Sequence, residues 1–125
     1  MTLPRWLILL GSIVMFVGAV LHIVGGSLGV FPALMKAGLD PQISGAVKCV
    51  WVVVSAHGIL LAPALVWISR RQGTRDLLRY LALIPVVDAT LMYHFVGFFA
   101  GFYIVLASAL LLLSGAWLLP ADQRA

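Results

Sequence analysis

Ionisable side chains lie inside otherwise apolar stretches of this sequence, and Asp88 is the clearest example. It stands near the middle of a run from Leu77 to Val96 that is long and apolar enough to cross a membrane. A carboxylate at the centre of such a helix costs about 2.5 to 3.5 kcal/mol, so we expect it to face neighbouring helices and to find a donor there. Asp88 is therefore the first candidate for an acid–base group.

Six further polar side chains in the apolar segments are candidates for the same site: His22, Lys48, His57, Tyr93, His94 and Tyr103. We expect Asp88, His57 and Tyr93 to be the catalytic groups of an enzyme, if the protein is one. We expect His22, His94 and Tyr103 to line the same pocket. From their depth in the spans, Asp88 is expected to pair with His57, and His22 with His94 or Tyr103. At 100° per residue, however, His94 and Tyr93 point about 120° and 140° away from Asp88, so one helix cannot aim all three at one point.

Each of these residues also has a purely structural interpretation. A histidine near a helix end can bond a carbonyl group or a lipid headgroup, and a mid-membrane Asp88–His57 pair can simply hold two helices together. Lys48 can extend its ammonium group to the membrane surface. His22 and His57 are the candidate metal ligands, and Cys49 is a further candidate for haem. These residues share no metal-ligand spacing, and no known catalytic motif is present.

The composition places the chain in a membrane. Hydrophobic residues make up 63% of the 125 residues, charged residues only 10%, and the mean hydropathy is +1.13. A soluble domain needs roughly a quarter of its residues charged. The net charge of +4 comes mostly from the arginines of one short segment, 70–79, which marks membrane topology rather than a nucleic-acid partner.

The apolar runs predict an all-α integral membrane protein, a single domain of four transmembrane helices packed as a bundle. The expected spans are about 6–26, 46–68, 77–96 and 102–119. The segment from Gly25 to Gly45 is expected to be the longest loop, with a short interfacial helix around Pro32 to Ala37. Pro63 and Pro85 are expected to kink the second and third spans.

Small residues recur every seven positions in three of the spans, which favours close helix packing, either within one chain or between copies. The three sets are Gly11, Gly18 and Gly25; Ser55, Ala62 and Ser69; and Gly101, Ser108 and Gly115.

The distribution of basic residues predicts a bacterial-type inner membrane protein with both termini in the cytoplasm. Arg5, Arg124 and the arginines of 70–79 would then lie on the cytoplasmic side, and Lys36 and Lys48 on the other. In this orientation the polar residues gather in the outer half of the bundle, where we expect the pocket.

Two short motifs, LHIVGG from Leu21 to Gly26 and VVD from Val86 to Asp88, resemble the styrene oxide isomerase family. The resemblance covers most of the chain at low identity. It implies a small four-helix membrane protein that forms trimers, binds haem b and isomerises epoxides, with His22 and Asp88 carried over. The family's axial histidine falls around Val50 in this chain and its asparagine near Ala56. Neither residue type is present there, so the expected axial position for haem b is not matched.

The catalytic tyrosine of that family falls near Val96, with Tyr93 and Tyr103 only nearby. Three functions therefore stay open: an isomerase-like enzyme for a small hydrophobic substrate that enters from lipid, a non-catalytic accessory or self-associating subunit, and a small transporter.

Overall fold

The computed structural model describes residues 1–120, and over that range it consists of helices and turns without a strand. The elements are α1 (Leu3–Gly25), a π-helical turn (Gly26–Val30), α2 (Phe31–Lys36), α3 (Pro41–Ile68), α4 (Arg75–Leu81), α5 (Ile84–Val96) and α6 (Ala100–Leu118). The prediction of an all-helical chain is confirmed. Three helical stretches are long and apolar enough to cross a membrane: Leu3–Lys36, Pro41–Ile68 and Ala100–Leu118. Arg124, one of the basic residues from which the membrane topology was predicted, lies outside the described residues.

The first span does not end at Gly26, and the prediction of a long loop from Gly25 to Gly45 is wrong. The chain continues as one helical rod through the π-helical turn into α2. In this turn the amide of Phe31 bonds the carbonyl of Gly26, five residues back. Pro32 follows in the first turn of α2. Its ring would clash with a regular α-helical turn before it, and a wider turn relieves such a clash.

The second span also begins earlier than expected, at Pro41 rather than near residue 46. Asp40 caps it, because its carboxylate accepts the amides of Gln42 at 2.8 Å and Ile43 at 3.3 Å. Pro41 then occupies the first turn, where its missing N–H leaves no bond unmade. Only a short turn around Gly38, whose φ is +65°, separates α2 from α3.

The third span is two helices rather than one kinked helix. α4 ends at Leu81 and α5 starts at Ile84, with Pro85 in its first turn. At Gly97, with φ of +83°, the chain reverses, and α6 runs back antiparallel to α5.

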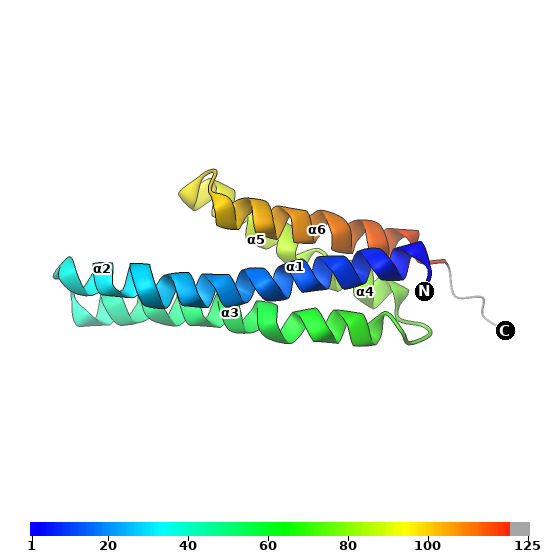
Figure 1. The fold of residues 1–125 in the computed structure, drawn as a ribbon, viewed down its shortest axis with the longest axis horizontal. Coiled ribbons are helices and arrows are strands. Elements are labelled where there is room, and N and C mark those ends of the chain that lie inside the picture. Colours follow the sequence, from blue (N-terminus) through cyan, green and yellow to red (C-terminus); the bar gives the residue numbers. More distant parts are fainter. Residues whose placement is uncertain (121–125) are drawn as a thin grey trace.

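Close packing centres on α1, which lies between α3 and α6 (Figure 1). Glycines allow this approach: a Cβ on Gly115 would lie 2.7 Å from a side-chain carbon of Ile8 and 2.8 Å from the carbonyl oxygen of Pro4. A Cβ on Gly11 would likewise lie 2.8 Å from a side-chain carbon of Leu112, and a Cβ on Gly58 would lie 2.8 Å from the Cβ of Ala19. Most of the small-residue positions noted in the sequence are thus used inside the chain.

The bundle is closed at one end and open along one side. At the end that carries the arginines, the buried side chains of Ile8, Leu65, Leu78 and Leu112 form a common core, so α4 seals the gap between α3 and α6. Farther along, α5 packs on α6 but makes almost no contact with α3. One side of the molecule, between α3 and α5, is therefore left unsealed by helix packing.

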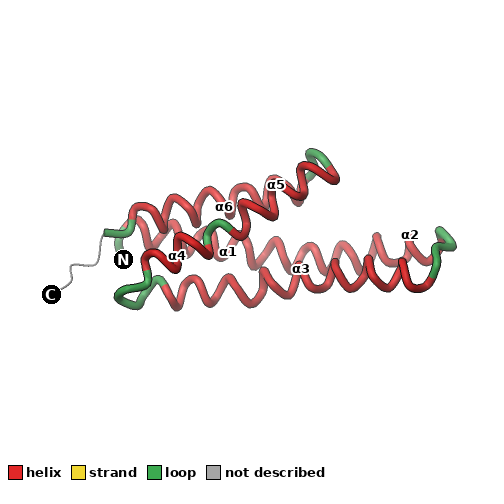
Figure 2. Tube along the Cα trace, turned by 180° about the vertical axis from the view of Figure 1, so that it is seen from behind, coloured by secondary structure: helices red, strands yellow, loops and turns green. Residues whose placement is uncertain are grey.

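The rod of α1 and α2 and its partner α3 extend well past the tip of α5 and α6 (Figures 1 and 2). Gly18 contacts Ile104, close to the start of α6, and His22 contacts Ser55 of α3. The hairpin made by residues 23–54 therefore projects beyond the tip by about 14 residues, or about 20 Å at 1.5 Å per residue. The N-terminus and the end of α6 lie together at the opposite, arginine-rich end.

Candidate functional site

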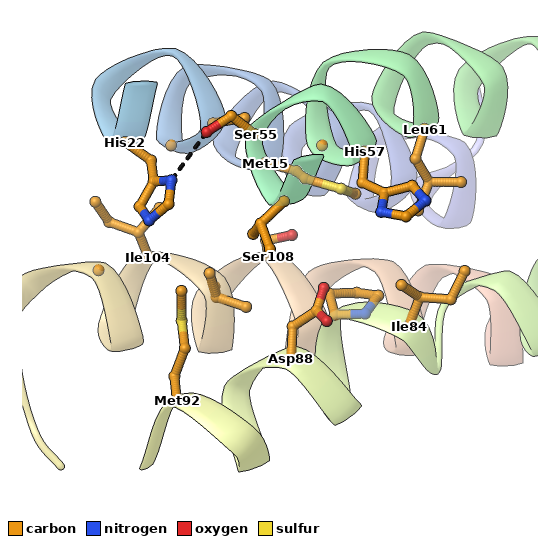
Figure 3. Close-up of a pocket in the computed structure, with 17 residues that line it drawn as sticks. Met15, His22, Ser55, His57, Leu61, Ile84, Asp88, Met92, Ile104 and Ser108 are labelled. Carbon is orange, nitrogen blue, oxygen red and sulfur yellow. Dashed lines mark hydrogen bonds between the residues drawn. The ribbon is translucent and has the colours of Figure 1, made fainter. Parts of the chain in front are cut away.

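A central cavity of about 80 Å³ lies between α1, α3, α5 and α6 (Figure 3). Its walls are mostly apolar, with side chains such as Leu61, Ile84, Ile104 and Val105. Gly18, Ala19 and Gly58 also line it, at the places where α1 packs closely on α6 and α3. On α6 the lining residues run from Gly101 to Ser108, in the half of the helix away from the arginine-rich end.

Asp88 and His57 face this cavity from opposite walls. The Asp88 side chain is half-buried and points from α5 into the cavity, while the His57 ring reaches toward it from α3 (Figure 3). No hydrogen bond or ion pair joins the two side chains, and both line the same cavity. Because α3 and α5 are not packed together here, His57 is also exposed on the unsealed side.

His22 is the third ionisable group of the cavity, and its ring is fixed by Trp51. The two rings stack at 4.0 Å with an angle of 5° between their planes. The indole Nε1 of Trp51 donates to the carbonyl of His22 at 2.7 Å. Gly26 leaves the space for this indole, since a Cβ there would overlap the Trp51 ring. The second glycine of the LHIVGG motif, Gly26, thereby has a packing explanation.

The hydrogen bonds around His22 assign its tautomer. Ser55 has one hydroxyl proton, which it donates to the carbonyl of Trp51 at 3.0 Å. Its oxygen is then the acceptor for His22 Nδ1, at 2.9 Å. Nδ1 therefore carries the ring hydrogen, and the lone pair of Nε2 is directed into the cavity, where it can accept a proton or a hydrogen bond (Figure 3).

Ser108 adds an unused hydroxyl to the same space. The residue is completely buried, and its Oγ has no hydrogen-bond partner among the described residues. Buried hydroxyl groups are normally bonded, so an unpaired one on a cavity wall is a ready contact for a polar group of a ligand. Met15 and Met92, on opposite walls, supply flexible apolar surface that can adapt to a ligand's shape.

Three of the candidate residues lie elsewhere. The expected pairing of His22 with His94 or Tyr103 is wrong, because His22 bonds Ser55 and stacks on Trp51. Tyr93 and Tyr103 belong to an aromatic cluster with Phe98 and Phe102 at the tip of α5 and α6. His94 is exposed and packs edge-on against Phe95. Rotation around α5 points Tyr93 and His94 away from the side of the helix on which Asp88 lines the cavity, and Tyr103 lies on α6 in the aromatic cluster.

The cavity does not fit haem b. An engineered protein cavity of about 150 Å³ binds a molecule of the size of benzene, whereas a haem macrocycle is several times larger than benzene and this cavity is about half that size. The part of the chain that the structure describes also contains no cluster of three or more histidine, cysteine or carboxylate side chains that could hold a metal ion. The Nε2 of His22 has the right lone pair for an axial ligand, but the walls leave no space for a macrocycle beside it.

Sequence reasoning missed Trp51, Ser55 and Ser108 as parts of this site. Ser55 and Ser108 were visible only as members of the seven-residue small-residue pattern. The signal that could have found them is that serine, unlike glycine or alanine, keeps a polar group at each close helix contact.

No known protein family, no characterised protein and no solved structure matches this chain. The site therefore has to be interpreted from its own geometry. That geometry defines a helical protein with three membrane-crossing candidates and an internal, mostly apolar cavity that holds a few polar groups.

Proposed function

We propose that the protein is a membrane-embedded, isomerase-type enzyme for a small, mostly apolar molecule. The observation that carries this proposal is the meeting of Asp88, His57 and His22, from three different helices, at one apolar cavity. Ionisable groups inside a membrane are costly and are usually kept for function. The unsealed side between α3 and α5 supports entry of the substrate directly from the lipid.

In the proposed reaction Asp88 donates a proton to an epoxide oxygen while one C–O bond breaks, and His57 removes a proton from the neighbouring carbon, whose C–H electron pair forms the new C=C bond. The substrate is rearranged without a net gain or loss of atoms. Asp88 is then a carboxylate and His57 an imidazolium, and transfer of the proton from His57 back to Asp88 restores both groups. Ser108 and His22 orient the substrate's polar end.

The test is turnover of a panel of small apolar epoxides by the purified full-length protein in lipid nanodiscs. Asp88→Asn should lower kcat by about 100-fold or more, because an amide cannot donate the proton. The matched control is Asp76→Asn, which changes a carboxylate that is 87% exposed at the other end of the molecule and should leave the rate unchanged. Equal rates for the wild type and Asp88→Asn, or no conversion of any substrate, would refute the proposal.

A second candidate function is that of a self-associating or accessory subunit, with a homotrimer as the arrangement that the family resemblance implies. This function is supported by Gly25, Gly29 and Gly45, all on the projecting hairpin, because a Cβ added at any of them would have no neighbouring atom within 4 Å. Small residues of this kind let a second helix approach closely. Cross-linking in native membranes separates the two functions, because a strictly monomeric protein would exclude this one.

A further inference from the structure

A second cavity, unrelated to the first, lies at the arginine-rich end of the molecule and has a volume of about 180 Å³. Three arginines line it from separate segments: Arg5 from α1, Arg71 from the turn after α3, and Arg75 from α4. Thr2, Ser69 and Gln72 add hydrogen-bonding groups. The lining of this cavity is therefore strongly positive and rich in hydrogen-bond donors, which are the two properties that bind a phosphate group.

The arginines of this cavity have little negative charge to balance them. In the described part of the chain, the acidic residue at this end is Asp76, which lies 3.6 Å from Arg75 and from Arg79 and is 87% exposed. Arg5 and Arg71 form no ion pair within that part of the chain. Arg71 is instead held over the Trp67 ring, 4.8 Å from its centre. The cavity therefore carries positive charge that the described residues do not balance.

Exposed tryptophans place this cavity at a membrane surface. Trp6, Trp67 and Trp117 lie near this end on α1, α3 and α6, and each is about half exposed or more. Tryptophan side chains concentrate at the level of lipid headgroups, and basic pockets between membrane helices at that level bind anionic headgroups. The anion nearest to such a cavity is the phosphate of a phospholipid.

Two further hollows follow this cavity along the seam between α1 and α3, and each shares at least one lining residue with the one before it. A small hollow beside Arg5 and Ser69 leads to Leu9 and Val66. Val66 in turn lines a groove of about 200 Å³ with Ile13, Phe16 and Pro63. An arginine-lined polar cavity and an apolar groove thus lie one after the other along the same seam. A phospholipid has the same order, with a charged head group followed by an apolar acyl chain.

We propose that this end of the protein binds one anionic phospholipid, with its phosphate among Arg5, Arg71 and Arg75 and one acyl chain in the α1–α3 groove. The site is independent of the proposed enzyme activity. It would fix the depth of the protein in the bilayer and tie together the starts of α1 and α4 and the end of α3. A zwitterionic lipid fits less well, because its own cation would meet the arginines.

The test measures the thermal unfolding temperature of the full-length protein in mild detergent as lipid is titrated. Phosphatidylglycerol should raise it at lower concentration than phosphatidylcholine with the same acyl chains. The double variant Arg5→Gln/Arg71→Gln should weaken the apparent affinity for phosphatidylglycerol about tenfold or more, since two charge-assisted hydrogen-bond groups are lost. Lys36→Gln/Lys48→Gln, which removes the same charge from the projecting hairpin, is the matched control and should change the affinity less than about twofold.

A second pair of variants tests the acyl-chain groove. Val66→Trp fills it and should weaken binding of phosphatidylglycerol, whereas Leu60→Trp, at a 70% exposed position of α3 that lines none of these cavities, should not. Inorganic phosphate should stabilise the protein far less than the lipid.

Three results would overturn the proposal: equal stabilisation by the two lipids, equal stabilisation by inorganic phosphate, or an equal loss in the lysine control. If Arg5→Gln/Arg71→Gln does not fold, native mass spectrometry of the wild type, given equal amounts of both lipids, decides the matter. Preferential retention of phosphatidylglycerol is then expected, and equal retention refutes the site.

Discussion

At the scale of single residues, the cavity depends on how one histidine is held. His22 is fixed by a stack on Trp51 and by a hydrogen bond to Ser55, whose own proton is used on the Trp51 carbonyl. With the hydrogen on Nδ1, as these bonds favour, the lone pair of Nε2 faces the cavity. The sequence predicted that His22 points into the bundle, and it does. The wrong partners were predicted because the depth of a residue in a span does not fix its direction around the helix.

The assigned tautomer can be tested by long-range ¹H–¹⁵N NMR of the histidine rings in the detergent-solubilised protein. His22 should show a protonated Nδ1 and an unprotonated Nε2. In Ser55→Ala the acceptor for Nδ1 is lost, so the Nδ1–H form should no longer dominate. A dominant Nε2–H form in the wild type would contradict the assignment.

The same Ser55→Ala variant should lose about 0.6 to 1.7 kcal/mol of unfolding free energy, the range typical of hydrogen bonds between membrane helices. The matched control is Thr90→Ala, because the Thr90 hydroxyl bonds only the carbonyl of Val86 on its own helix. Denaturation in mixed micelles measures both variants, and the loss should be clearly smaller for Thr90→Ala. Equal losses would mean that the Ser55 contact does not join α1 to α3 in solution.

At the scale of helices, glycine positions decide which pairs pack closely. Gly115 lies against the backbone of α1, where a Cβ would be 2.8 Å from the Pro4 carbonyl oxygen and 3.0 Å from the Ile8 amide nitrogen. Gly45, inside α3, meets nothing within 4 Å. The same residue type therefore has opposite roles at two positions of the same fold.

Gly115→Ala should destabilise the protein by about 1 to 3 kcal/mol, because backbone atoms cannot move aside as a flexible side chain can. Gly45→Ala should be neutral or stabilising by up to about 1 kcal/mol, since alanine favours a helix over glycine. Unfolding free energies of both variants, measured under the same conditions, check the contrast. Equal effects at the two positions would show that the α1–α6 contact is looser than described.

The helices also show how far sequence reasoning reaches. Apolar runs located the three long helices, because hydropathy depends only on composition. The start of α3 was missed although Asp40-Pro41 is a recognisable helix start, since the glycines and prolines around it indicated a loop. The break at Ala82 was not predicted either, because Pro85 signals an irregularity without fixing whether the helix bends or ends. Asp88, His57 and His22 line one cavity in the structure, whereas Tyr93, His94 and Tyr103 do not, because the depth of a residue in a span does not fix the direction in which its side chain points.

At the scale of the whole molecule, the two ends differ in charge and in shape. The arginine-rich end carries the N-terminus, the end of α6 and a tightly packed core. The other end is the projecting hairpin, which carries Lys36, Asp40 and Lys48 near its tip. This asymmetry supports the proposed topology, in which the arginine-rich end faces the cytoplasm.

Cysteine labelling tests that topology. In a Cys49→Ser background, a cysteine introduced by Gln42→Cys should react with a membrane-impermeant maleimide added outside intact cells, because Gln42 is exposed near the tip of the hairpin. A cysteine introduced by Gln72→Cys, in the arginine-rich turn, should react only after permeabilisation. The reverse pattern would place the arginines outside.

The unequal lengths of the helices have a consequence for the surrounding lipid. The rod from Leu3 to Lys36 contains 34 residues and α6 contains 19, and both present apolar side chains outward. A flat bilayer cannot match both lengths, so it has to thicken on the α1–α3 side, thin on the α5–α6 side, or let the molecule lean. Lipids would be most deformed at the step between these two sides, which is also where the gap between α3 and α5 opens. A small apolar solute would meet its least ordered lipid at that entrance.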